Sequence, residues 1–306
     1  MDKEYSAPNH LNYHIYLTAG QEPKAAILLL HGMQEHSGRY LDFAKHLNQQ
    51  RYAVITYDHV GHGHTAKSKA EMGFFRKRNP DGLLIYEAKQ MAYFMQSQFP
   101  DTPLILMGHS MGSFIARLLL QQTSGLFSGA IIMGTGSSNP AAILFRPILY
   151  VANAFAPKKR SRWLNKLFTK INNKEFKNEH PNDGTNWLSA NPANREAFQA
   201  DELCGLDFSN NAFYGLISLN VKATKTNWAD SLPKQMPLLF VSGSEDPIGN
   251  FGKGVKKTVK NLQTKGFTNV TIQLFPHMRH EILNEIDRQS VYTKIIDWLD
   301  DLTTNA

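Results

Sequence analysis

The chain has 306 residues, of which 42% are hydrophobic and 19% charged, and this balance excludes a disordered protein. The length suits one large domain or one domain that carries an insertion. A single cysteine, Cys204, excludes an internal disulfide framework and a multi-cysteine metal site. The formal charge of +7 raises nucleic acid or an anionic surface as a partner.

The ends and apolar runs of the sequence bear on targeting. The chain opens with charged residues that no apolar run follows, which argues against a signal peptide. No stretch approaches the roughly 18 apolar residues of a membrane-spanning helix. We therefore expect a soluble, cytoplasmic protein.

Short apolar runs alternate with longer amphipathic stretches through the first part of the chain. The runs predict strands buried on both faces, as in a parallel sheet, and the stretches between them predict helices. A looser alternation over residues 12–18 predicts an antiparallel edge strand. The predicted strands are 26–30, 53–57, 104–107 and 130–133, and the predicted helices are 38–50, 83–99 and 111–123.

The pattern changes near residue 138. Residues 138–228 contain no strand of the earlier type and are rich in Asn, Lys, Phe and Trp. The alternation then returns with strands and helices at 238–241, 251–265, 270–274 and 287–300. We therefore predict an α/β fold in which residues 1–137 and 229–306 form one core and residues 138–228 are an insertion.

The strongest chemical signal is the motif Gly108-His109-Ser110-Met111-Gly112. It lies between a predicted strand and a predicted helix, where a sharp turn holds the serine in strained geometry and exposes its hydroxyl above the sheet. Glycines are needed on both sides because side chains there would collide with the neighbouring strand or helix. The alternative is a glycine-rich turn with an incidental serine, but the context favours a nucleophile.

A serine nucleophile needs a base and an orienting carboxylate, which in this architecture follow in the order acid, then histidine. Glu245 and Asp246 follow the first strand after the insertion. Asp246 is favoured because Pro247 stiffens the loop behind it, and Glu245 is the reserve. His277 and His280 both follow the last predicted strand, and spacing alone does not separate them.

Acyl transfer also needs N–H donors for the developing oxyanion. The predicted donors are the amide of Met111, directly after the serine, and the amide of Met33, in the loop after the first buried strand. His59, His62 and His64 have the spacing of a metal cluster, but the glycines between them indicate a tight loop. Since no nearby cysteine or carboxylate set completes a site, we predict no metal and no cofactor.

Taken together, these segments resemble the α/β-hydrolase superfamily and, within it, the monoacylglycerol lipase and lysophospholipase-like group of serine aminopeptidase type. The resemblance extends over most of the chain outside the insertion. It depends on five motifs in the right order, at residues 31–40, 57–63, 108–112, 243–249 and 279–285. One small departure is Thr65, where serine is usual.

The resemblance implies a mostly parallel, eight-stranded sheet flanked by helices, with residues 138–228 as a helical cap, or lid. It implies the catalytic triad Ser110, Asp246 and His280, because the group's histidine lies in an Arg-His-Glu phrase. Met33 and Met111 match its oxyanion-hole positions. The implied reaction is hydrolysis of a carboxylic ester through an acyl-enzyme at Ser110, without a cofactor.

The positive charge is concentrated in one segment of the insertion. From Arg146 to Lys177, nine basic residues stand against one acid, Glu175, so this segment carries +8 and the rest of the chain −1. This distribution removes the argument for nucleic-acid binding by the core. The apolar stretch 141–151 overlaps the start of this segment, and we expect either a solvated cap face or transient contact with an anionic membrane surface.

Two other kinds of function stay open at this point. A serine aminopeptidase or an acyltransferase uses the same triad, but a peptidase needs an acidic pocket for the amino group of its substrate, and the basic cap argues against one. A non-catalytic ligand-binding protein on this fold usually has a broken triad, whereas all three positions are filled here. The leading prediction is an esterase that acts on monoacylglycerols or lysophospholipids.

Overall fold

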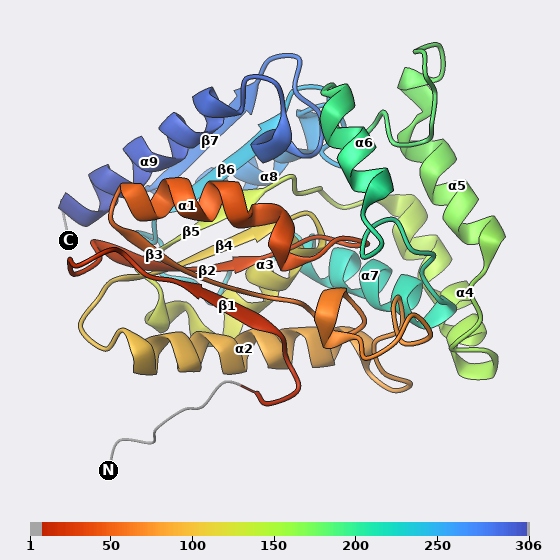
Figure 1. Cartoon of the computed structure of the whole chain (residues 1–306), viewed down its shortest axis with the longest axis horizontal. Coiled ribbons are helices and arrows are strands. Elements are labelled where there is room, and N and C mark those ends of the chain that lie inside the picture. The colour runs from red at the N-terminus through yellow and green to blue at the C-terminus, as the bar shows by residue number, and fades with distance from the viewer. Residues whose placement is uncertain (1–7, 305–306) are drawn as a thin grey trace.

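The computed structural model describes residues 8–304, in which seven strands form one sheet with helices on both faces (Figure 1). The strand order is β1-β3-β2-β4-β5-β6-β7, and β1 alone runs antiparallel to its neighbour. The strands are β1 (Tyr13–Tyr16), β2 (Ala25–Leu30), β3 (Tyr52–Tyr57), β4 (Leu104–His109), β5 (Gly129–Met133), β6 (Leu238–Gly243) and β7 (Val270–Phe275).

The prediction of eight strands is wrong for the described part of the chain. An eighth strand before β1 would pair with its outer edge, but residues 8–12 form a turn instead. The amide of Leu11 donates to the carbonyl of Pro8 (3.0 Å), and the Leu11 side chain is buried in the core. The amide of Asn12 donates to Oγ1 of Thr65 (2.9 Å), so the backbone here is used for turn and loop contacts.

Side chains along the central strands alternate between two helical layers. In β2, Leu28 packs on the side of α2, α3, α7 and α8, whereas Ile27 and Leu29 pack on the side of α1 and α9. Because both faces are covered, these strands have the continuous apolar runs that predicted them. The helices are α1 (Leu41–Gln49), α2 (Pro80–Gln98), α3 (Met111–Thr123), α7 (Asn210–Ala223), α8 (Lys253–Thr264) and α9 (Arg288–Thr304).

Residues 138–228 lie between β5 and β6 and contain α4 (Pro140–Phe155), α5 (Arg162–Asn172), α6 (Pro192–Ala200) and α7. The last of these differs from the others, because α7 packs on α2 and α3 and its apolar side chains join the main core. The other three, drawn in green in Figure 1, lie at one end of the sheet. No helix within residues 8–304 has the length and apolar character to cross a membrane.

The loops that carry the predicted site residues follow β2, β4, β6 and β7. These strands are parallel, so their carboxyl ends meet at one end of the sheet. In open α/β sheets, sites form at this end. The fold therefore gathers four loops that are far apart in the sequence.

Candidate active site

Ser110 lies at the turn between β4 and α3. Its backbone has φ 52° and ψ −116°, a conformation that residues with a side chain rarely adopt, and its amide donates to the carbonyl of Met133 (3.0 Å). A Cβ on Gly108 would overlap the carbonyl oxygen of Gly112, and a Cβ on Gly112 would overlap that of Leu30. The two glycines of the motif are therefore required by the close approach of strand and helix.

His280 and Asp246 face each other from the loops after β7 and β6. Nδ1 of His280 lies 3.0 Å from Oδ2 of Asp246, and both side chains are buried. The carboxylate also accepts hydrogen bonds from the amide of Ile248 (2.9 Å) and the hydroxyl of Ser242 (3.2 Å). Because Oδ2 can only accept, Nδ1 of the neutral imidazole carries its proton and Nε2 keeps its lone pair.

The two residues that sequence spacing left as alternatives pair with each other elsewhere. The side chain of His277 is 92% exposed, and its Nδ1 lies 3.3 Å from Oε1 of Glu245. The second carboxylate oxygen of Glu245 lies 3.9 Å from Nε of Arg279. The structure thus brings Asp246 to His280 and leaves Glu245 and His277 toward the surface.

Ser110 and His280 line one small cavity, with a volume of about 20 Å³. Met33 lines the same cavity, and the chain between β5 and β6 contributes the apolar side chains of Trp187, Leu188 and Phe198. The Trp187 ring centroid lies 5.1 Å from that of His280. Among the described residues, no hydrogen bond joins Ser110 to His280; such bonds are often long without substrate.

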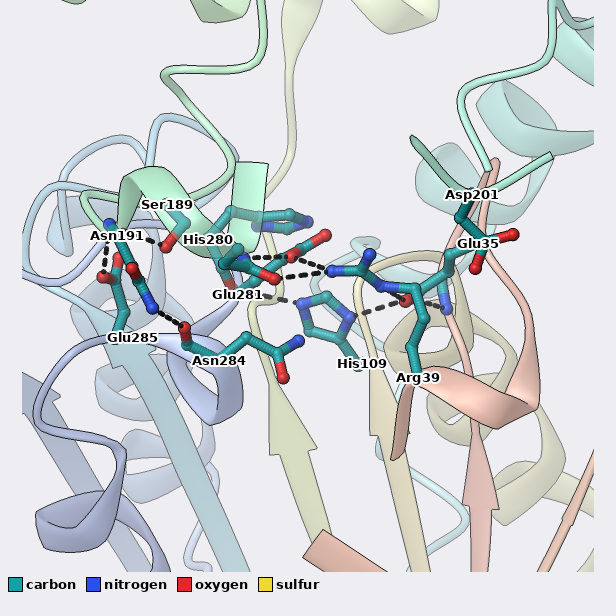
Figure 2. Close-up of polar contacts among 12 residues, drawn as sticks. Glu35, Arg39, His109, Ser189, Asn191, Asp201, His280, Glu281, Asn284 and Glu285 are labelled. Atoms are coloured by element: carbon teal, nitrogen blue, oxygen red, sulfur yellow. Dashed lines mark hydrogen bonds and ion pairs between the residues drawn. The ribbon is translucent and has the colours of Figure 1, made fainter. Parts of the chain in front are cut away.

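A network of buried charges borders this cavity (Figure 2). Oε1 of Glu35 accepts hydrogen bonds from the amide of Gly32 (2.5 Å) and the hydroxyl of Tyr40 (2.8 Å). Arg39 donates to Oε2 of Glu281 (2.5 Å) and lies 3.5 Å from Glu35. Burial alone would raise the pKa of the Glu35 carboxyl, but His109 and Arg39 hold it well below its usual range.

The loop that carries His280 is bound to residues 186–194, which lie between β5 and β6 and which we call the inner segment. Glu285 accepts from the amides of Ala190 (2.8 Å) and Asn191 (3.2 Å), and also from the amide of Arg279 (3.0 Å). The amide of Glu281 donates to the carbonyl of Leu188 (2.7 Å). Figure 2 shows Glu285, Asn191 and Asn284 at one end of this contact. The sequence motif at residues 279–285 contains Glu281, Asn284 and Glu285 but gave no sign of their partners.

The histidines with metal-like spacing do not share one cluster. His59 and His62 pack with His31, with ring centroids 4.2 Å and 5.1 Å from it, whereas His64 is exposed. Burial lowers the pKa of all three packed rings, that of His62 to about 3. They are neutral side chains of a buried loop.

The described residues place one set of metal-ligand side chains together: His36, Asp201 and Cys204, with ligand atoms within 4.8 Å of one another. Nδ1 of His36 accepts from the amide of Gly38 (3.2 Å), so Nε2 carries the proton of the neutral ring and donates it to Asp201 (2.8 Å). No lone pair of His36 faces the cluster, and its donor set fits hydrogen bonding rather than a metal ion.

A comparison with known proteins places this site in a family. The family model described as serine aminopeptidase, S33, matches residues 21–287. The chain belongs to this family. It is 28% identical to human monoglyceride lipase over 290 residues, which cover 93% of this chain and 85% of the lipase.

Solved structures show the same likeness for this family member. A carboxyl esterase from Bacillus coagulans, in complex with glycerol, has a TM-score of 0.86 at 27% identity and covers 96% of this chain and 94% of its own. A soluble variant of monoglyceride lipase from Saccharomyces cerevisiae, with a substrate analog, has a TM-score of 0.76 at 20% identity, covers 95% and 92%, and shows the fold alone. The predicted α/β-hydrolase fold and the monoglyceride lipase-like group are confirmed.

Proposed function

We propose that this family member hydrolyses carboxylic esters through an acyl-enzyme at Ser110. The chain is an ester-hydrolysing serine hydrolase of the monoglyceride lipase-like group. The observation that carries the proposed mechanism is the 3.0 Å contact of His280 with Asp246, beside a cavity that His280 shares with Ser110. The likeness to human monoglyceride lipase and to the Bacillus esterase supports the same reaction.

In the proposed reaction, Nε2 of His280 takes the proton of Ser110 as the serine oxygen attacks the ester carbonyl. His280 then gives this proton to the oxygen of the leaving alcohol. Water attacks the acyl-enzyme in the second half, with His280 again as base, and the carboxylic acid leaves. Asp246 holds the tautomer of His280 and stabilises its charged form.

The proposed oxyanion donors are the amides of Met33 and Met111. Met111 is the first residue of α3, where an amide has no partner inside the helix and lies at its positive end. Met33 follows Gly32, whose amide is held by Glu35, and lines the cavity with Ser110. Each such donor contributes about 10²–10³ to the rate.

The proposed substrate is a monoacylglycerol or a related single-chain lipid ester. The insertion lines the cavity with Trp187, Leu188 and Phe198, which suit an acyl chain better than a small polar group. The two carboxylates at the cavity, Glu35 and Glu281, are already paired with His109 and Arg39. This pairing argues against an aminopeptidase, which needs an acidic group for the amine of its substrate.

A fluorophosphonate probe and an ester panel test this proposal. We expect the probe to label the protein at Ser110 and Ser110→Ala to abolish labelling. Within p-nitrophenyl esters, those with medium or long acyl chains should be hydrolysed faster than those of C2 to C4 acids, and monoacylglycerols should be hydrolysed as well. Absence of labelling in the folded protein would contradict the enzyme assignment, and turnover of short esters alone would contradict the lipid substrate.

We further propose that residues 138–228 act as a cap whose outer helices, α4 and α5, contact a lipid surface. Apolar side chains are exposed on both helices, among them Leu144 and Phe155, which are 72% and 88% exposed, and Trp163. Lysines lie along α5 and just beyond it, at 166, 170, 174 and 177. Exposed apolar side chains beside lysines are typical of surfaces that bind anionic membranes.

Charge reversal tests this contact. Replacing Lys166, Lys170 and Lys174 with glutamate should weaken binding to phosphatidylcholine vesicles that contain phosphatidylserine by at least about tenfold, and leave turnover of a soluble ester unchanged. The matched control replaces three exposed lysines of α8, at 256, 257 and 260. Arg160 is unsuitable because it donates to the carbonyl of Met72 (2.7 Å). Equal loss in both variants, or no loss, would contradict the contact.

A further inference from the structure

His109 precedes the nucleophile and has no part in the reaction above, yet it is buried between two loops of the site (Figure 2). Its Nε2 lies 3.1 Å from the carbonyl oxygen of His280. Its Nδ1 lies 2.8 Å from the hydroxyl of Tyr40 and 3.2 Å from Oε1 of Glu35. Each ring nitrogen therefore faces an oxygen of a different loop.

These contacts determine where the protons of His109 lie. The carbonyl of His280 can only accept, so Nε2 carries a proton. Oε1 of Glu35 can only accept as well, and the Tyr40 hydroxyl donates its one proton to that oxygen (2.8 Å), which leaves the hydroxyl oxygen to accept from Nδ1. Both nitrogens then carry protons. Burial would lower the pKa of His109, but Glu35 and then Glu281 raise it above its ordinary value.

The charged ring joins the two loops on which catalysis depends. On one side, Glu35 accepts from both His109 and the amide of Gly32, and so fixes the loop that presents Met33. On the other side, His109 donates to the backbone of His280 itself. Glu35 and His109 are 74 residues apart in the chain, and His109 and His280 are 171 apart. The His109 side chain therefore fixes the position of two loops that are distant in the sequence.

The ring of His109 also lies close to the base, with its centroid 4.8 Å from that of His280. The charged and titratable groups that face it are Glu35, Tyr40, His280 and Glu281, and Arg39 is bound to both carboxylates. A positive charge at this distance disfavours a second imidazolium on His280.

We propose that His109 is a positioning residue: a buried imidazolium that joins the oxyanion loop to the loop of His280 and places a positive charge beside that base. This inference depends on the proposed function, because it acts through the assigned base. It adds a residue that takes no proton from substrate and touches no reacting atom.

The decisive comparison is His109→Gln against Glu35→Gln, read by the pH dependence of kcat/KM and of fluorophosphonate labelling. His109→Gln removes the positive charge beside the proposed base, so the acid limb of activity should move up by about one pH unit, with kcat lowered about tenfold or more. Glu35→Gln removes the carboxylate that keeps His109 charged, so His109 becomes neutral. The charges of residues 35 and 109 then sum to zero, as they do in the wild type. We expect a lower kcat and an acid limb within about 0.3 pH unit of the wild type.

His277→Gln is the matched control, since His277 is an exposed histidine three positions before the base. It should change neither kcat nor the acid limb. If the wild-type protein labels and His109→Gln loses activity with the acid limb unmoved, His109 is only structural and the inference is wrong. If the wild-type protein does not label at all, the proposed function is what fails.

A measurement on the wild-type protein covers the case in which His109→Gln does not fold. Nitrogen-15 NMR of histidine-labelled protein at pH 7.5 should show one imidazole with both nitrogens protonated, because exposed histidines are mostly neutral at that pH. Glu35→Gln should abolish that signal. Absence of such a ring in the wild-type protein would overturn the inference.

Discussion

The inner segment and the outer helices both lie between β5 and β6 but differ in burial and in the contacts that they make. The inner segment, residues 186–194, uses backbone amides and carbonyls to bind buried groups such as Glu285 and Arg279 of the last loop. The outer helices, α4 and α5, expose large apolar side chains such as Leu144 and Phe155. The boundary of an insertion in the sequence is therefore not the boundary of a functional unit in the structure.

The inner segment and the outer helices differ in the contacts with buried charged groups that would be lost if they moved away from the core. Separating the inner segment from the last loop would remove two of the three amides that donate to Glu285 and the backbone carbonyls that accept from Arg279. Both side chains are buried, so losing these partners is costly. Arg279 donates to the carbonyl of Asn186 (2.7 Å) and its guanidinium carbon lies 4.0 Å from the Phe176 ring centroid. Among the described residues, the buried polar side chains of α4 and α5 are uncharged asparagines. The inner segment is therefore bound to the loop of His280 by contacts to charged groups that the outer helices lack.

The largest expected effect lies at Ser110, the proposed nucleophile. Ser110→Ala should lower kcat for a monoacylglycerol by about 10⁴-fold or more, because the remaining groups cannot form an acyl-enzyme. Asp246→Asn should also lower kcat strongly, whereas Glu245→Gln should keep it within about twofold. Comparable losses for Asp246→Asn and Glu245→Gln, measured with one soluble ester, would contradict the assignment of Asp246.

A second prediction tests the inner contact through stability. Glu285→Ala removes the acceptor of three backbone amides, those of Arg279, Ala190 and Asn191. We expect the free energy of unfolding to fall by about 2–4 kcal/mol and kcat to fall with it, because the loop of His280 loses its support. Urea titration measures the first and ester turnover the second. An unchanged urea midpoint would show that the inner segment is held by something else.

A third prediction concerns the buried histidines of the core. His62 packs on Phe208 of the insertion and stays neutral in the folded protein, with a pKa of about 3. In the unfolded chain, His62 binds a proton below about pH 6.5. The contribution of His62 to the free energy of unfolding is therefore fully present above about pH 6.5 and is lost as the pH falls below it. The expected slope is about 1.4 kcal/mol per pH unit for each such histidine. His62→Phe should reduce the slope between pH 6 and pH 4 by that amount, and an unaltered slope would exclude this residue as its source.

The smallest effect is expected on the outer helices. Leu144→Asn should change the free energy of unfolding by less than about 0.5 kcal/mol, because this side chain is already 72% exposed. Leu149 lies on the same helix but is buried, and Leu149→Asn should cost about 2–4 kcal/mol. If both substitutions cost the same, the exposed face of α4 is covered in solution and the outer helices do not differ from the inner segment in this respect.

Local signals in the sequence predicted most of the sheet. Residues 26–30, 53–57 and 104–107 fall within β2, β3 and β4, because strands buried on both faces must be apolar throughout. The turn around Ser110 could also be predicted, because Gly108 and Gly112 indicate that two backbone segments approach each other closely. The eighth strand came from resemblance alone, and in residues 8–12 the structure has a turn in its place.

Long-range pairing was beyond the reach of the sequence. Nothing local distinguishes Glu35, which binds His109, from Glu245, which lies at the surface, because burial and partner are set by tertiary packing. The same holds for Glu285, whose partners lie 94 and 95 residues away in the chain. Spacing in the sequence did not decide between His277 and His280. In the structure, His280 is the one that contacts Asp246.

Trp187 should act as a fluorescent probe of the site. Its indole lies 5.1 Å from the ring of His280 and lines the cavity of Ser110, so charge on the base or an acyl chain in the cavity changes its surroundings directly. Trp163, by contrast, is exposed on α5. A protein that keeps only these two of its four tryptophans would report, at two emission wavelengths, acylation at the centre and events at the outer surface.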